Sequence, residues 1–478
     1  MDSKKEMIKN TIIIFIGRIS TQFISFLLLP IYTYYLSTSD YGVVDLIQTY
    51  IALFVPIIAL RLDSSVFRYL IDSRNDDKDK KKIISSSLIV LIIQIIVFSI
   101  LYVIVGMFIE IHYYKLIIIN IIFMTLSSVL LQVSRGIGDN IGYSITCCIT
   151  GLVTIILNVI LVIIFRLGGT GVLISSGIAN FVGCLFIFFR NKLYYYIDSS
   201  SIDKSKIKQL LKYSLPMIPD GLSWWVINAS DRTIVSTFIG ASANGIYAVS
   251  SKFSNILSSF FSVINMSWQE SAALHINDDD RDDFFSDTIN NILNIFVVLC
   301  VGIMACIPIA FDLLIGENYY EAIKYIPILL LSNIFNVLGG MFGGIYISKK
   351  LTKEVAKTTV FAAIINFLIN IVFIKKIGIY AAAVSTLIAY FVMFLYRYID
   401  CKKFIKFKFD KKIVLFSIII FIFSSILYYL NNIIGNCFNI IVVVIYALIS
   451  NRKNLKFIME ILKNKFKKWG KKWTMLMI

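Results

Sequence analysis

The sequence predicts an all-α polytopic membrane protein of about 14 transmembrane helices, arranged as two pseudo-symmetric six-helix lobes plus two extra C-terminal helices. Three observations predict this class: the composition, the repeated apolar runs and the placement of Lys and Arg. Of the 478 residues, 58% are hydrophobic and only 16% are charged, and the mean hydropathy is +0.81. A chain of that composition does not fold with a water-facing surface, so the bilayer is its solvent.

Each apolar run is long enough to cross a bilayer, which takes about 20 residues. In the first half of the chain the runs lie at about 11–35, 43–62, 84–109, 113–134, 141–165, 169–189 and 213–239. In the second half they lie at about 245–269, 290–311, 326–347, 357–374, 379–396, 413–430 and 433–450. The first run is too long for a signal-peptide core and lacks a small-residue cleavage site, so we expect it to remain as a span.

Lys and Arg give the orientation of the spans, because short basic loops stay in the cytoplasm. Of the 46 Lys and Arg residues, the joints on one side of the spans carry only Lys115, Arg166, Lys324, Lys375 and Lys376. The joints on the other side and both ends of the chain are rich in them, so we expect the N and C termini to be cytoplasmic. The net charge of +17 is spread over many such joints, which excludes a single nucleic-acid recognition element.

Two weak internal matches predict the division into lobes. The segment 36–43 resembles 239–246, and 168–182 resembles 378–392, each pair being six spans apart. An even number of spans gives both halves the same orientation, as in transporters with parallel repeats. We expect an N-terminal lobe at 1–190, a cytoplasmic linker at 191–212, a C-terminal lobe at 213–400, two extra spans at 401–450 and a basic amphipathic tail at 451–478.

Residue usage excludes several chemistries. Seven scattered Cys without a C-x-x-C pair exclude a disulfide scaffold. With only His112 and His275 in the chain, a zinc site is not expected, and we predict no metal and no cofactor. Short outer joints and the absence of a His beside an intramembrane carboxylate make an integral membrane enzyme, such as a polysaccharide polymerase, the least favoured reading.

Four basic residues lie inside the predicted spans, although each costs about 2.5–3.5 kcal/mol if it faces lipid. They are Arg18, Arg61, Arg232 and Lys252. Arg61 is near the inner end of its span, so we expect its side chain to snorkel to the inner interface. The other three must be hydrated or paired, and an intramembrane charge of this kind indicates a functional site.

Polar residues repeat at helical spacing in the first, seventh and eighth spans, and this predicts a hydrated cavity between the lobes. We expect the cavity to be lined by Arg18, Gln22, Asp220, Trp224, Asn228, Asp231, Arg232, Lys252 and Asn255. The bases outnumber the acids, so the cavity favours an anion such as a phosphate. The alternative is packing: polar side chains join membrane helices, and Asp231 neutralises Lys252 or Arg232.

The stretches 215–236 and 245–254, with Gly17-Arg18, Asp40-Tyr41-Gly42 and 378–386, resemble the Wzx-type polysaccharide flippases of the MOP exporter superfamily. The resemblance implies translocation of an undecaprenyl-diphosphate-linked oligosaccharide from the inner to the outer leaflet by alternating access, with Arg18, Arg232 and Lys252 as the cavity cations. It also implies the bacterial cytoplasmic membrane, a polysaccharide polymerase and a chain-length regulator as partners, and H⁺ or Na⁺ as a coupling ion. A peptidoglycan-precursor flippase and a cation-coupled multidrug exporter share this helical plan and stay open as alternatives.

Overall fold

The computed structural model describes residues 17, 24–110 and 112–452, and every regular element in this part of the chain is a helix. Eleven of these helices are long and apolar enough to cross a membrane. The all-α, multi-pass membrane class predicted from the sequence is therefore confirmed. The count of 14 stays a prediction, because the first span lies mostly outside the described residues and two long helices, α11 and α12, are more polar than the eleven.

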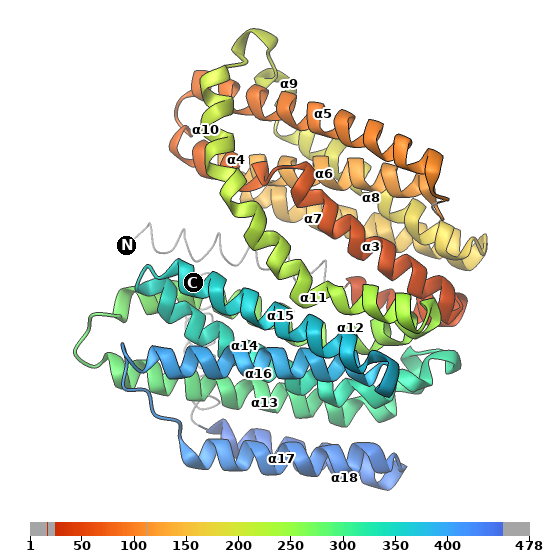
Figure 1. Ribbon diagram of the computed structural model, residues 1–478, viewed down its shortest axis with the longest axis vertical. Helices are drawn as coiled ribbons and strands as arrows, with labels where there is room; N and C mark the ends of the chain where they lie inside the picture. Colours follow the sequence, from red (N-terminus) through yellow and green to blue (C-terminus); the bar gives the residue numbers. More distant parts are fainter. Residues whose placement is uncertain (1–16, 18–23, 111, 453–478) are drawn as a thin grey trace, which may run out of the picture.

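The helices form two groups with α11 running between them (Figure 1). We call α2–α8 the N-terminal helix group and α11–α16 the C-terminal helix group. The N-terminal group contains α2 (Leu29–Tyr35), α3 (Thr38–Ile58), α4 (Leu62–Asp72), α5 (Asp77–Phe108), α6 (Tyr114–Ile137), α7 (Asn140–Asn158) continued by the π-helix η1 (Val159–Ile164), and α8 (Gly168–Arg190). The short helices α9 (Leu193–Tyr196), η2 (Ser199–Ser201), α10 (Lys204–Ser214) and η3 (Leu215–Met217) connect the groups.

The C-terminal helix group carries the extra helix pair at its far edge, away from α3 (Figure 1). The group contains α11 (Ile218–Phe238), α12 (Ala241–His275), α13 (Arg281–Leu314), η4 (Glu317–Tyr325), α14 (Ile326–Ser348), α15 (Thr352–Ile377) and α16 (Tyr380–Cys401). The extra pair, α17 (Lys411–Leu430) and α18 (Ile433–Ser450), packs on α13. The boundaries of the predicted lobes stay a prediction, and most of the predicted basic tail lies outside the described residues.

The second span differs from its predicted bounds of 43–62. Helix α3 begins earlier because Ser37 caps it, its hydroxyl accepting a hydrogen bond from the Asp40 amide. It ends at Ile58, shortly after Pro56, and Leu60 and Arg61 then adopt left-handed backbone conformations before α4 begins. The predicted run continued across this break to Leu62, although Arg61, Asp63 and Ser64 around it are polar.

The two helix groups meet closely where α3 and α12 begin. A Cβ atom on Gly42 would overlap the Ala241 carbonyl, and one on Gly245 would overlap the Thr38 carbonyl. The Asn244 amide donates to the Gly42 carbonyl at 2.7 Å. These residues belong to the two segments that match each other in the sequence, 36–43 and 239–246, so the matching segments face one another across the interface.

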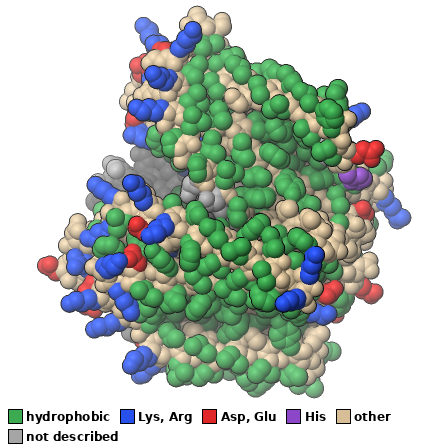
Figure 2. Space-filling model, viewed as in Figure 1, with side chains coloured by type: hydrophobic (Ala, Val, Ile, Leu, Met, Phe, Trp, Pro, Cys, Tyr) green, Lys and Arg blue, Asp and Glu red, His purple; other side chains and the backbone are tan. Residues whose placement is uncertain are grey.

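The surface matches a membrane environment. Figure 2 shows a continuous field of hydrophobic side chains over the helices, with most Lys and Arg at one end of them. That end carries the joints between α4 and α5, α12 and α13, α14 and α15, and α16 and α17 (Figure 1). Because basic joints stay in the cytoplasm, we call this end the inner end and the contact of α3 with α12 the outer contact.

Candidate functional site

Arg232 of α11 forms an ion pair with Asp45 of α3, across the two helix groups. The Arg232 Nε lies 2.6 Å from Asp45 Oδ2, and the two side chains are only 12% and 8% exposed. Arg232 Nη2 also donates to Ser251 Oγ at 3.1 Å. A buried ion pair is strongly destabilised when one partner is removed, so this pair holds α3 and α11 together while it is intact.

Lys252 of α12 also reaches across to the N-terminal part of the chain. Its Nζ donates to Ser25 Oγ at 3.0 Å, one turn before α2. Among the described residues, Asp45 and Arg232 are near enough to act electrostatically on Lys252, although Lys252 itself lines neither pocket described below.

Asp231 has different partners from those the sequence indicated. Its carboxylate is 2% exposed and accepts hydrogen bonds from Asn370 at 2.8 Å, Thr386 at 2.6 Å and Tyr247 at 3.0 Å. These donors all belong to the C-terminal helix group. Among the described residues no ion pair joins Asp231 to Lys252, so the expected neutralisation of that lysine by Asp231 does not occur in this structure.

A cavity of about 480 Å³ lies between α3 and α11 beside the ion pair. Asp45, Thr49 and Arg61 line it from the N-terminal helix group, and Trp225 and Arg232 line it from α11. The Trp225 indole Nε1 donates to the Thr49 carbonyl at 2.9 Å, which fixes the ring against α3. The cavity thus has one cation from each helix group on its wall and an aromatic ring beside them.

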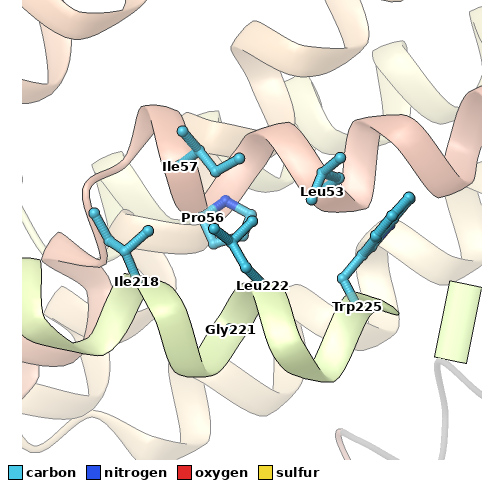
Figure 3. A pocket seen from close by; sticks show the side chains of 7 residues that line it. All are labelled: Leu53, Pro56, Ile57, Ile218, Gly221, Leu222 and Trp225. Carbon is cyan, nitrogen blue, oxygen red and sulfur yellow. The ribbon is translucent and has the colours of Figure 1, made fainter. Parts of the chain in front are cut away.

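Towards the inner end, α3 and α11 close on each other through apolar side chains. Figure 3 shows Leu53, Pro56 and Ile57 of α3 facing Ile218, Leu222 and Trp225 of α11, with Gly221 between them. Gly221 and Pro56 also line the larger cavity, so the apolar contact is continuous with it. Apolar side chains therefore border the cavity on this side, with the Arg61 guanidinium beside Gly221.

Arg61 lines the cavity, although the sequence predicted that its side chain would only snorkel to the inner interface. Its backbone is left-handed, with φ +55°, at the break between α3 and α4. Its Nη2 donates to Ser64 Oγ at 3.3 Å, and its Nε lies 4.0 Å from Asp63 but is buried without a hydrogen-bond acceptor. The side chain is near the inner end, as expected, but it lines the same cavity as Arg232 instead of leaving it.

The structure brings together only some of the predicted cavity residues. Arg232, Asp231 and Asn255 line a second, small polar pocket of about 50 Å³ inside the C-terminal helix group. Arg18 and Gln22 lie outside the described residues, and so do the side chains of Asp220, Trp224 and Asn228. Their places in the cavity stay a prediction. Asp45 and Trp225 are the additions that the structure makes.

The fold is similar to that of known transporters. The lipid II flippase MurJ in an inward closed conformation matches with a TM-score of 0.69 and 18% identity, over 94% of this chain and all of the other. A multidrug resistance MATE family transporter of the MOP superfamily matches in its inward-facing conformation with a TM-score of 0.67 and 14% identity, over 82% of this chain and 98% of the other. An outward-facing MATE structure gives 0.57 at 14% identity, over 84% and 96%.

The sequence matches the family model described as "Polysaccharide biosynthesis protein" over residues 7–268, which is more than half of the chain. The comparison with curated proteins gave no significant match. The family and the similar structures are of the transporter and flippase type and not of a catalytic type. The chain belongs to the polysaccharide biosynthesis protein family, with which the predicted resemblance to Wzx-type flippases is consistent, and its fold is similar to that of a MOP-superfamily transporter.

Proposed function

We propose that this protein translocates undecaprenyl-diphosphate-linked oligosaccharide repeat units from the inner to the outer leaflet of the bacterial cytoplasmic membrane, for the synthesis of a surface polysaccharide. The observation that carries the proposal is the cavity between α3 and α11, where Arg61 and Arg232 enter from opposite helix groups. A diphosphate offers the oxygen geometry that guanidinium groups bind in bidentate fashion. Trp225 supplies an aromatic surface for a sugar or for the lipid isoprene next to it.

The ion pair of Arg232 with Asp45 couples substrate binding to the movement of the two helix groups. An incoming diphosphate competes with the Asp45 carboxylate for the Arg232 guanidinium, so substrate binding removes a bond that joins α3 to α11. The bound anion keeps Arg232 neutralised, so the roughly 3–5 kcal/mol cost of an unpaired buried charge falls on Asp45 until the groups separate and water reaches it. Binding therefore weakens the contact between the helix groups only when the correct anion is present, and the groups then rock apart at the outer contact.

No covalent step is needed, because an inside-negative potential favours outward movement of an anion by about 2.3 kcal/mol per charge per 100 mV. A coupling cation has a place if one is used. Asp231 is buried among the side-chain donors of Tyr247, Asn370 and Thr386 and borders the polar pocket of about 50 Å³. We assign the candidate H⁺ or Na⁺ site to this carboxylate, in a pocket that Arg232 also lines.

The test replaces Arg61 and Arg232 singly by Gln in cells that depend on this protein for surface polysaccharide. Each variant should insert normally, lose surface polymer and accumulate lipid-linked repeat units on the cytoplasmic side. Lys252→Gln and Arg18→Gln complete the set of predicted cations. Arg68→Gln is the matched control, because Arg68 is half-exposed on α4 and pairs with Asp72 away from the cavity.

The same cells separate the alternatives. Growth arrest on depletion, with surface polymer intact, would assign the protein to the peptidoglycan precursor, and hypersensitivity to toxic cations would assign it to drug export. Normal polymer in all four cavity variants would refute the assignment of the cavity. The proposed partnership with a polymerase and a chain-length regulator is tested by measuring the length of the surface polymer that the variant cells still make.

A further inference from the structure

An apolar cavity, distinct from the two polar pockets described above, lies on the opposite side of the C-terminal helix group from the cavity between α3 and α11. It has a volume of about 470 Å³ and is lined almost wholly by apolar side chains of α13, α14, α16 and α17. Helix α17 packs on α13 and α18, so this groove separates it from α14 and α16. In Figure 1, α17 and α18 lie at the edge of the molecule, away from α3 and α11. A groove in this position opens to the lipid.

The groove begins in the inner half of the membrane on α17 and extends past the middle on α14, where Leu331 and Leu338 line it 17 and 10 residues before the inner end at Ser348. On α17 its lining extends from Val414, one turn after Lys411, to Ile422. Those eight steps cover about 12 Å at 1.5 Å per residue. One leaflet of the hydrocarbon core is about 15 Å thick, so the groove accommodates a chain that enters from the inner leaflet. On α16 the lining residues Phe391 and Phe394 lie within three turns of the inner end at Cys401.

The inner mouth of the groove carries Lys406, Lys408, Lys411 and Lys412 beside two acids, Asp410 before α17 and Asp282, which accepts from the Lys406 amide. The segment between α16 and α17 alternates buried Ile405 and Phe407 with exposed Lys406 and Lys408, and half-buried Phe409 lines the groove itself. The alternation is held by backbone hydrogen bonds to α13: the Lys408 amide donates to Ser286 Oγ at 3.1 Å, and its carbonyl accepts from Asn290 at 3.0 Å. This pairing turns the Phe409 ring into the groove and leaves the Lys408 side chain in solvent.

Lys411 and Lys412 begin α17 beside the same mouth and are also exposed. Among the described residues no ion pair involves Lys408, Lys411 or Lys412. An apolar groove that opens beside three free ammonium groups at the inner interface matches a lipid with an anionic head group. We propose that this groove binds one anionic phospholipid of the inner leaflet, with an acyl chain between α17 and α14–α16 and its phosphate at Lys408, Lys411 and Lys412.

The position of the groove favours a phospholipid over the polyprenyl tail of the substrate. The tail is covalently joined to a diphosphate, which we place in the cavity between α3 and α11. The groove lies beyond α14 and α16 from that cavity, so a tail would have to pass around the C-terminal helix group to reach it (Figure 1). A resident phospholipid instead fills the gap beneath α17 and fastens the extra helix pair to the group.

The experiment is native mass spectrometry of the full-length protein, titrated with dioleoyl phosphatidylglycerol or with dioleoyl phosphatidylcholine, which has the same chains and no net charge. Ile418→Trp fills the groove, since Ile418 lines it and is 52% exposed. Ile419→Trp is the matched control: it is the next residue on α17, 51% exposed, and does not line the groove. A second pair of variants tests the role of the Lys residues. The K408Q/K411Q/K412Q variant removes three charges at the groove, and the control K204Q/K208Q/K212Q removes three charges from exposed positions on α10.

We expect the wild type to retain one phosphatidylglycerol with at least about tenfold preference over phosphatidylcholine, since each Lys near the surface favours an anionic lipid by a severalfold factor. Ile418→Trp should weaken the binding of both lipids about tenfold or more, and the K408Q/K411Q/K412Q variant should lose only the preference. Both control variants should bind as the wild type does. Equal binding of the two lipids by the wild type, or unchanged binding by Ile418→Trp, would overturn the proposal. Displacement of the retained lipid by equimolar undecaprenyl phosphate would also overturn it and give the groove to the substrate tail.

Discussion

Asp45 determines whether Arg232 is paired before the substrate binds. A free Arg232 would bind any anion and would repel Lys252, whereas an Arg232 paired with Asp45 exchanges one carboxylate for the substrate's phosphate. The exchange keeps Arg232 paired with an anion and leaves Asp45 without its cation. Arg61 lines the same cavity and is held only loosely, with its Nε 4.0 Å from Asp63.

The coupling of Asp45 to Arg232 is measurable by a double-mutant cycle. Asp45→Asn and Arg232→Gln should each lower the thermal unfolding midpoint in detergent, and the double variant should be more stable than the sum of the two effects by about 1–3 kcal/mol, because the first substitution already breaks the pair. The matched cycle of Asp72→Asn with Arg68→Gln should show a coupling below about 1 kcal/mol, since that pair is exposed. Additive effects at Asp45 and Arg232 would mean that the bridge between the helix groups contributes nothing.

At the residue scale the sequence predicted the cations better than their partners. Arg232 and Lys252 stand out in apolar runs, and the structure places both at the interface of the helix groups. Asp45 has the same signal, an isolated charge in a predicted span, but it was not among the predicted cavity residues. Arg61 lies near the inner end as predicted, and what the sequence did not reveal is that its side chain lines the cavity.

Arg397 shows how a buried cation is used for packing rather than for binding. It is 4% exposed, and its guanidinium donates to the Gly339 carbonyl of α14 and to Thr358, Val355 and Thr359 of α15. Arg397→Ala leaves those acceptors unpaired and should lower stability by about 3–5 kcal/mol. Arg397→Lys keeps the charge without the planar fork and should recover only part of that loss. Thermal unfolding in detergent measures both, and a recovery to wild-type stability by Lys would contradict the role of the fork.

The outer contact is the element that alternating access must open. The hydroxyls of Thr38 and Ser242 lie 2.6 Å apart where α3 and α12 begin. Oxidation of a T38C/S242C variant should therefore cross-link the helix groups and reduce translocation at least about tenfold, with recovery on reduction, because α3 and α12 must separate to release the substrate outside. Each single Cys variant serves as the control. Full activity of the cross-linked protein would show that this contact stays closed during transport.

Element boundaries were harder to predict than element identities. The apolar period identified the spans, but helix ends depend on single side chains such as Ser37 at α3 and Asp139 at α7, whose carboxylate accepts from the Gly142 amide. The seventh run, predicted from 213, begins as α11 only at Ile218, because Pro216 and Pro219 separate it from α10. The sequence repeat, in contrast, did indicate a feature of the structure. Gly42 and Gly245 are needed where the backbones of α3 and α12 touch, so the two segments are similar because they form one contact.

At the scale of the whole molecule, the two helix groups, the anion cavity between them and the separate carboxylate of Asp231 allow two sources of driving force. Membrane potential acts on the net charge of the moving complex, whereas an ion gradient acts only through a site that binds the ion. These two sources are separable by experiment, because Asp231 lines only the small polar pocket, whereas Arg61 lines only the larger cavity and Arg232 lines both.

In proteoliposomes carrying a fluorescent polyprenyl-diphosphate oligosaccharide, we expect an inside-negative potential to raise outward translocation severalfold, since each moved charge gains about 2.3 kcal/mol per 100 mV. Asp231→Asn should leave that response intact and remove any additional response to a Na⁺ or H⁺ gradient, whereas Arg232→Gln should abolish translocation under every gradient. Valinomycin with potassium sets the potential, and chemical quenching of the exposed fluorophore measures the rate. A rate that follows the ion gradient alone, and is lost with Asp231→Asn, would mean that the ion drives the cycle. The exchange of Asp45 for diphosphate on Arg232 would then determine which substrate is carried, and the energy would come from the ion.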